Sequence, residues 1–145
     1  MVVRSAIHRK ARMRRKICEV VEVVRNAQKI GRKCTLLIGS GCSVTAGIPA
    51  AKGFVERIES DWPEAYKRAT NKTYPQCMTQ LLPDERRALI AEYVDKAKIN
   101  WAHIGIAQLI KHGFVDRVLT TNFDPLVVRA CALANEYLAV YDFAY

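Results

Sequence analysis

The stretch most informative about the fold reads Leu36-Leu37-Ile38-Gly39-Ser40-Gly41-Cys42-Ser43-Val44-Thr45-Ala46-Gly47-Ile48-Pro49. The apolar run Cys34–Ile38 ends at a glycine, which predicts a short strand buried on both faces, as in parallel sheets. A Gly-x-Gly turn lets the backbone approach a phosphate, and a following helix favours negative charge at its start. The turn is equally consistent with a tight structural turn, because Val44 replaces the third glycine of the dinucleotide-binding pattern and no Walker lysine follows.

Helical and strand patterns alternate along the rest of the chain. Apolar periodicity predicts helices over residues 17–30, 50–58, 101–111 and 124–134, and strands over residues 34–38, 114–120 and 137–143. The charged, proline-containing middle, about residues 60–100, predicts a small helical module with helices around 64–69 and 84–98. We therefore expect an α/β fold, a Rossmann-like parallel sheet with helices on both faces and an inserted helical module.

Only three strands are expected, whereas doubly wound sheets commonly use five or six. We therefore expect the sheet to be incomplete in this chain, and an exposed parallel edge to be covered by self-association, by a complex or by further sequence. The expected organisation is a basic arm, residues 1–16, and the N-terminal portion of a larger domain, residues 17–145.

Charge is concentrated at the start of the chain. Of the formal net charge of +9, residues 1–16 carry +7, with seven Lys or Arg and no acidic residue. Such an arm binds nucleic acid or an acidic partner, or is a solvated terminus; a transit peptide is disfavoured because Ser5 is its only hydroxyl residue. With no apolar run long enough to span a membrane and no secretory leader pattern, we expect a soluble, cytoplasmic protein without a membrane partner.

The five cysteines form no C-x-x-C pair. Their odd number and irregular spacing disfavour a disulfide framework or a zinc ribbon, and fit a reducing compartment. We expect no metal site.

A second informative stretch reads Val118-Leu119-Thr120-Thr121-Asn122-Phe123-Asp124-Pro125. A predicted strand ends here in polar residues, and the carboxyl ends of parallel strands line the ligand crevice of open α/β sheets. Asn122 offers a donor and an acceptor, and Asp124 offers a carboxylate. For Asp124 alone the favoured interpretation is a helix cap, with Pro125 in the first turn of the helix.

Together the two stretches resemble the sirtuin superfamily, and more closely its zinc-less, NAD-hydrolysing branch found in bacterial antiphage defence proteins. The family motifs Gly-Ala-Gly-x-Ser, Ser-Gly-Ile-Pro, a distant helical His and Thr-Gln-Asn-Ile-Asp correspond to four sets of residues here. These are Gly39-Ser40-Gly41-Cys42-Ser43, Ala46-Gly47-Ile48-Pro49, His103 and Thr120-Thr121-Asn122-Phe123-Asp124. The resemblance covers roughly residues 34–134.

The resemblance implies an NAD site without metal. The loop residues Gly39, Ser40, Gly41 and Ser43 would cradle the diphosphate, with Cys42 in the same binding set, and Ala46, Gly47 and Ile48 would line the ribose and nicotinamide pocket. Thr121 belongs to the same binding set, Asp124 would hold the carboxamide, and Asn122 would be catalytic, holding the ribose or the attacking water. His103 is expected to be structural.

Departures from the family pattern shape the expected activity. Ala50-Ala51-Lys52 replaces the Asp-Phe-Arg loop of deacetylases, and Thr121 replaces the usual Gln, as in the NAD-hydrolysing branch. Sirtuins use a general-base His in a His-Gly pair after the Asn-Asp strand, whereas His112-Gly113 precedes that strand here. We therefore expect this chain to be the N-terminal portion of a larger domain, with the base coming from beyond residue 145 or from another chain, or to be a family member that lacks its base. We expect an NAD glycohydrolase acting in antiphage defence. The alternatives are an NAD-dependent protein-lysine deacylase and a catalytically silent NAD- or nucleic-acid-binding subunit.

Overall fold

The computed structural model describes residues 16–141, so the predicted basic arm, except Lys16, and residues 142–145 lie outside it. In chain order the elements are α1 (Ile17–Lys29), β1 (Cys34–Ile38), the 3-10 turns η1 (Ser40–Cys42) and η2 (Val44–Ala46), α2 (Ala51–Asp61), α3 (Pro63–Arg68), α4 (Tyr74–Gln80), α5 (Pro83–Lys96), α6 (Trp101–Lys111), β2 (Val115–Thr120) and α7 (Leu126–Leu133). The predicted helices and the first two strands are confirmed to within a few residues. Among the α-helices of residues 16–141, only α4 has no predicted counterpart.

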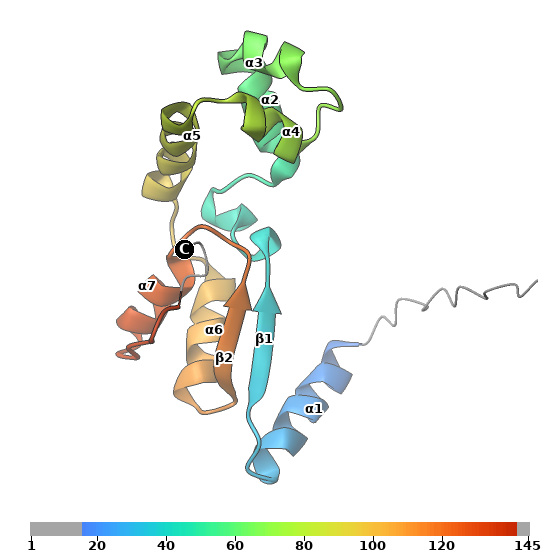
Figure 1. Ribbon diagram of the computed structural model, residues 1–145. Coiled ribbons are helices and arrows are strands. Elements are labelled where there is room, and N and C mark those ends of the chain that lie inside the picture. The colour runs from blue at the N-terminus through green and yellow to red at the C-terminus, as the bar shows by residue number, and fades with distance from the viewer. Residues whose placement is uncertain (1–15, 142–145) are drawn as a thin grey trace, which may run out of the picture.

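The two strands of the described residues lie side by side and parallel (Figure 1). Leu36 pairs with Val118 and Ile38 with Thr120, so both strands end at the same edge of the sheet. The chain between them runs through α2–α6 before it returns as β2, which is the crossover that parallel strands require. The α/β class is therefore confirmed, as a mixed fold with a two-stranded parallel sheet.

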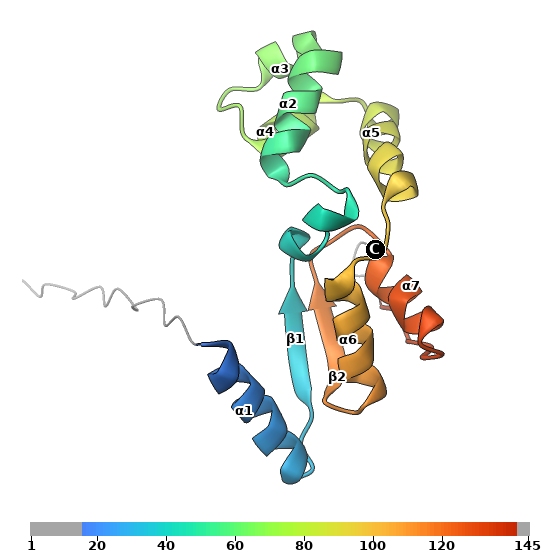
Figure 2. The ribbon, with the colours of Figure 1, turned by 180° about the vertical axis from the view of Figure 1, so that it is seen from behind.

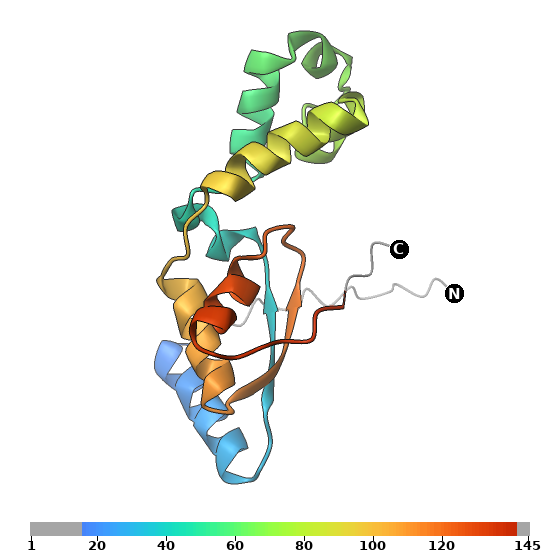
Figure 3. The ribbon, with the colours of Figure 1, turned by 90° about the vertical axis from the view of Figure 1, so that its left-hand side faces the viewer.

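Three finer expectations about the sheet are wrong within the described residues. Residues 137–141 form no strand; Leu138 packs instead against the cluster of Ala107, Ala130 and Cys131 between α6 and α7. Helices α6 and α7 lie on the same side of the strands (Figure 3). On β1 and β2, Leu37 is 77% exposed and Leu119 48% exposed, so the strands are not buried on both faces.

Helices α2–α5 form a helical body beyond the carboxyl ends of the strands (Figures 1 and 2). Its core gathers buried side chains from every helix of the body, among them Phe54, Ile58, Ala65, Cys77 and Leu89. This body begins with α2, earlier than the expected range of 60–100, because Phe54 and Ile58 of α2 belong to the same core. The helical body lies next to the edge of the sheet at which β1 and β2 end, where the glycine loop and residues 121–124 follow the strands.

Helix α1 carries the predicted apolar stripe, but none of its residues is buried. Ile17 and Val20 are among its exposed apolar side chains. No helix in residues 16–141 has the length and apolar character that a membrane span needs.

Candidate functional site at the carboxyl end of the strands

The glycine loop, residues 39–47, leaves β1 and folds into η1 and η2. Gly47 ends η2 with a φ of +103°, a conformation that strains any residue with a Cβ. Helix α2 begins only at Ala51, so no long helix starts directly at the Gly-x-Gly turn. The helix expected over residues 50–58 is therefore present, but an anion at the Gly-x-Gly turn would meet the start of a 3-10 turn, not the start of α2.

Free backbone donors lie at the start of η1. Within a 3-10 turn the first N–H groups have no partner inside the turn. Here Cys42 N–H donates to Gly39 O and Ser43 N–H to Ser40 O, which leaves the N–H groups of Ser40 and Gly41 outside this ladder. A Cβ at Gly41 would meet nothing within 4 Å, so packing in this structure does not require glycine there.

The second segment of the site, residues 121–124, follows β2 and lies next to the glycine loop. The register of the sheet places Gly39 beside Thr121, where a Cβ on Gly39 would lie 3.6 Å from Thr121 Oγ1. Thr121 N–H also donates to Ile38 O at 3.4 Å. Two segments about 80 residues apart in sequence are thus brought together by the parallel pairing.

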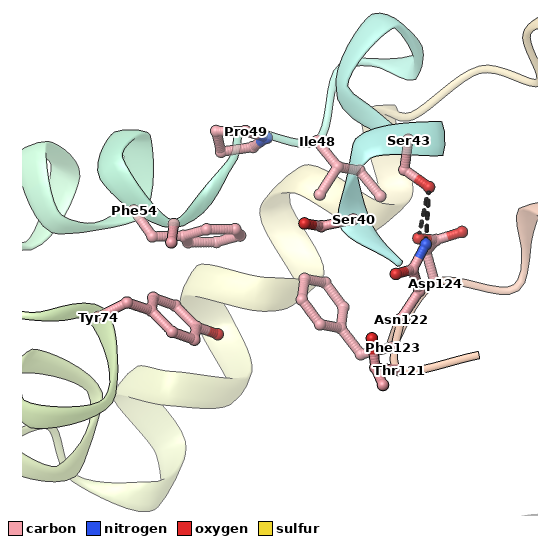
Figure 4. Close-up of a pocket in the computed structure, with 11 residues that line it drawn as sticks. Ser40, Ser43, Ile48, Pro49, Phe54, Tyr74, Thr121, Asn122, Phe123 and Asp124 are labelled. Carbon is pink, nitrogen blue, oxygen red and sulfur yellow. Dashed lines mark hydrogen bonds between the residues drawn. The ribbon is translucent and has the colours of Figure 1, made fainter. Parts of the chain in front are cut away.

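Ser43 is the hydrogen-bonding centre of the site. Its Oγ donates to Asp124 Oδ2 at 2.8 Å and receives Asn122 Nδ2–H at 3.2 Å (Figure 4). It also lies 3.3 Å from His103 Nε2, and both Ser43 and His103 are fully buried. One hydroxyl therefore joins the glycine loop, α6 and the Asn-Asp strand end.

The tautomer of His103 follows from its partners. Its Nδ1 accepts the Asn100 N–H at 3.2 Å, so Nδ1 carries no proton and the neutral ring is protonated at Nε2. His103 Nε2–H then donates to Ser43 Oγ, which leaves the Ser43 proton directed at Asp124. Burial lowers the pKa of His103 below its ordinary value of 6.5, while the nearby Asp124 opposes that shift.

Asp124 and Asn122 differ in how fully they are bonded. Asp124 Oδ1 accepts Leu126 N–H at 3.1 Å, which confirms the helix-cap interpretation, and Oδ2 accepts Ser43 Oγ–H. Asn122 Nδ2 donates to Ser43 Oγ and, at 3.3 Å, to Cys42 Sγ. Asn122 Oδ1 is buried and has no partner in the described part of the chain. That oxygen is the open hydrogen-bonding position of the site.

A cavity of about 230 Å³ opens beside these residues (Figure 4). Its polar wall comes from the two sequence-predicted segments, and its apolar wall from α2, α4 and the apolar residues of those same segments. The aromatic part is held together by ring contacts, with Phe54 5.6 Å from Tyr74 and 6.0 Å from Phe123 between ring centroids. The complete lining is Ser40, Ser43, Ile48, Pro49, Ala51, Phe54, Tyr74, Thr121, Asn122, Phe123 and Asp124.

The cavity brings together only part of the predicted site. Six predicted residues line it: Ser40, Ser43, Ile48, Thr121, Asn122 and Asp124. The other five, Gly39, Gly41, Cys42, Ala46 and Gly47, belong to the loop that supports it. Five lining residues were outside the predicted set: Pro49, Ala51, Phe54, Tyr74 and Phe123. Of these, Pro49 and Phe123 lie within the two quoted motifs, which could have indicated them.

Neither histidine of the described residues is placed as a general base. Both ring nitrogens of His103 are engaged. His112 caps the far end of α6, and β2 then runs about 20 Å, at roughly 3.3 Å per residue, before it reaches the site. No group of three or more His, Cys, Asp or Glu side chains within residues 16–141 is arranged to hold a metal ion.

No protein-family model matches the chain, and no curated protein or solved structure matches it.

Proposed function

We propose that this chain binds NAD and hydrolyses its nicotinamide–ribose bond, releasing nicotinamide and ADP-ribose, as an effector of antiphage defence. The supporting observation is that one cavity is lined by Ser40 and Ser43 of the glycine loop and by Asn122 and Asp124 of the strand end. These are the positions at which the sequence resembles the zinc-less branch of the sirtuin superfamily.

The size and walls of the cavity favour one end of a dinucleotide. At about 230 Å³ it is smaller than the roughly 300–1,000 Å³ of sites that enclose a drug-sized ligand. The nicotinamide ring of NAD is flat and positively charged, and aromatic faces attract such a cation. Phe54, Tyr74 and Phe123 supply those faces, so the nicotinamide ring would enter the cavity and the diphosphate would lie at the glycine loop.

The free donors of η1 suit the diphosphate. The N–H groups of Ser40 and Gly41 are available to anionic oxygens, and Ser40 adds an exposed hydroxyl. Because Gly41 carries no Cβ, a phosphate can approach its backbone closely.

The reaction builds positive charge on the ribose. The bond from ribose C1′ to the nicotinamide nitrogen breaks with its electron pair going to nicotinamide, which leaves as a neutral pyridine and needs no acid. A water oxygen then bonds to C1′ and loses its proton to solvent. The Asp124 carboxylate stabilises the developing positive charge, and Asn122 Oδ1 accepts a hydrogen bond from the ribose hydroxyl or from the water. Because the ribose cation is strongly electrophilic, a positioned water can attack it without a dedicated base.

The test is a mass-spectrometric assay for nicotinamide and ADP-ribose with the parent chain, Asn122→Ala and the control Asn71→Ala. Asn71 is exposed, lies in the loop before α4 and does not line the cavity. We expect the parent chain and the control to release both products, and Asn122→Ala to be at least about tenfold slower, the loss for about 1.4 kcal/mol of transition-state stabilisation.

Equal release from all three proteins would contradict the proposal, because it would identify a contaminating enzyme. Titration with ADP-ribose by calorimetry separates the remaining outcomes. Binding without release would support the alternative of a catalytically silent NAD-binding subunit, which the full engagement of both His103 nitrogens favours. If the chain shows no ADP-ribose binding and no product release, both the proposed activity and this alternative are overturned.

A further inference from the structure

We infer that Asn100 is a positioning residue that clamps the glycine loop to the start of α6 and thereby fixes the shape of the cavity. Asn100 precedes α6 and lies outside the cavity lining, so it does not act on a ligand directly. Its influence on NAD rests on the proposed function, whereas the clamp itself does not.

Every hydrogen-bonding position of the Asn100 side chain is used. Its Oδ1 accepts the N–H groups of Ala102 at 3.0 Å and His103 at 3.2 Å. Its Nδ2 donates to Cys42 O and to Thr45 Oγ1, both at 2.8 Å. A primary amide has two donor hydrogens and two acceptor lone pairs, and all four are engaged here.

This arrangement also fixes which way the amide faces. The N–H groups at the start of α6 require an acceptor, and the carbonyl oxygen of Cys42 requires a donor. Turning the amide over would place oxygen against oxygen and NH₂ against N–H. The orientation of Asn100 is therefore set by its partners.

Capping α6 needs only half of this side chain. Serine or aspartate would satisfy the free N–H groups of a helix start about as well as asparagine. The NH₂ group is used solely for the glycine loop, on either side of Ser43. In addition, the Asn100 backbone N–H holds His103 Nδ1, which directs His103 Nε2–H at Ser43. Asn100 thus acts on the Ser43 hydroxyl by two routes, through the loop and through the imidazole.

The clamp is testable because capping and clamping separate in Asn100→Asp. Aspartate keeps the oxygens that cap α6 and has nearly the same shape, but it cannot donate to Cys42 O. Asn100→Ala loses both functions. Thr45→Val removes one of the two loop contacts and introduces no charge near the Cys42 thiol.

The measurement is the alkylation rate of Cys42 by iodoacetamide under native conditions, followed by peptide mass spectrometry. Cys42 is half-buried, and its Sγ receives the Asn122 amide, so a loop that opens more often exposes the thiol more often. The exposed Cys18 gives the reference rate in the same sample, and the buried Cys77 reports global unfolding.

We expect Asn100→Asp to raise the Cys42 rate between about fivefold and thirtyfold, and Thr45→Val to raise it about fivefold, with Cys18 and Cys77 unchanged. Unchanged Cys42 labelling in both Asn100→Asp and Thr45→Val would overturn the clamp, because a residue that only caps α6 would be replaced without effect and Thr45→Val adds no charge that slows the thiol. If NAD is hydrolysed, the KM for NAD rises in Asn100→Asp more than kcat falls. If NAD is not hydrolysed, the labelling result still tests the clamp, so failure of the proposed function and failure of the clamp give different results.

Discussion

Replacing Ser43 by alanine is the most direct test of the hydrogen-bond network. The substitution removes one oxygen and leaves three groups without their shared partner: the Nε2–H of His103, the Nδ2–H of Asn122 and the Oδ2 of Asp124. Their surroundings differ, because His103 is fully buried, whereas Asn122 and Asp124 are half-buried and line the cavity. Water can replace the lost oxygen for the last two and not for His103.

The cost follows from that difference. A buried donor left unsatisfied costs about 1–3 kcal/mol, and a hydrogen bond to a carboxylate contributes about 1.5–3 kcal/mol, partly restored by water. We therefore expect Ser43→Ala to lower the free energy of unfolding by about 2–4 kcal/mol. Since domains of this kind unfold with about 5–15 kcal/mol, the variant remains folded but is clearly weakened.

Urea unfolding followed by circular dichroism measures this loss, with Ser40→Ala as the matched control. Ser40 lies three residues earlier in the same loop, lines the same cavity and is exposed, so its substitution should stay within about 0.5 kcal/mol of the parent chain. At a typical urea dependence, the midpoint of Ser43→Ala falls by about 1–2 M. Equal midpoints for the two variants would refute the reasoning, because Ser43 would then not hold the three groups together.

Two further predictions concern pH and the glycines of the loop. Because burial lowers the pKa of His103, the unfolded chain takes up a proton near pH 6.5 that the folded chain does not. The stability due to neutral His103 is therefore complete above pH 6.5 and falls below that pH by at most about 1.4 kcal/mol per pH unit. The slope of the unfolding free energy between pH 7 and 5.5 should therefore be flatter in His103→Gln than in the parent chain. Parallel slopes would contradict the lowered pKa of His103. At the loop, Gly47→Ala should cost about 1–2 kcal/mol because of its positive φ, whereas Gly41→Ala should leave thermal unfolding unchanged and weaken ADP-ribose binding. Equal effects of the two substitutions on stability would argue against this loop conformation.

Local patterns were sufficient to predict most of the elements. The strand before Gly39, the helix between Trp101 and Lys111 and the strand before Thr121 rest on apolar periodicity and on glycine stops, which act over a few residues. The proximity of Ser43 and Asp124 could also be anticipated, since parallel strands bring their carboxyl ends to one edge. Even α4 has a local signal, because Pro75 lies in its first turn, where proline is favoured.

The remaining features depend on packing between distant residues. Nothing in the sequence near Phe54 or Tyr74 indicates that their rings meet Phe123 across the cavity, because that contact depends on how the helical body sits over the sheet. The apolar run of β1 looks like a strand buried on both faces, yet burial requires a second layer, and α6 and α7 lie on one side only. Residues 137–141 have strand-like composition, but Leu138 finds its partners between α6 and α7.

The network also determines which substitution can report on chemistry. Asp124 holds the start of α7 through Oδ1 and Ser43 through Oδ2, so any change at Asp124 alters stability and the cavity together. Ser43 has the same double role. Asn122 is different, because its Nδ2 serves the network while its Oδ1 is buried without a protein partner. Buried polar atoms are nearly always hydrogen-bonded, so the unpartnered Oδ1 is the exception within this network. Asn122→Ala removes both groups, whereas Asn122→Asp keeps an acceptor, loses the donor to Ser43 and adds a negative charge near Asp124. Under the proposed function, Asn122→Ala is therefore the substitution that reports on Oδ1 without adding charge.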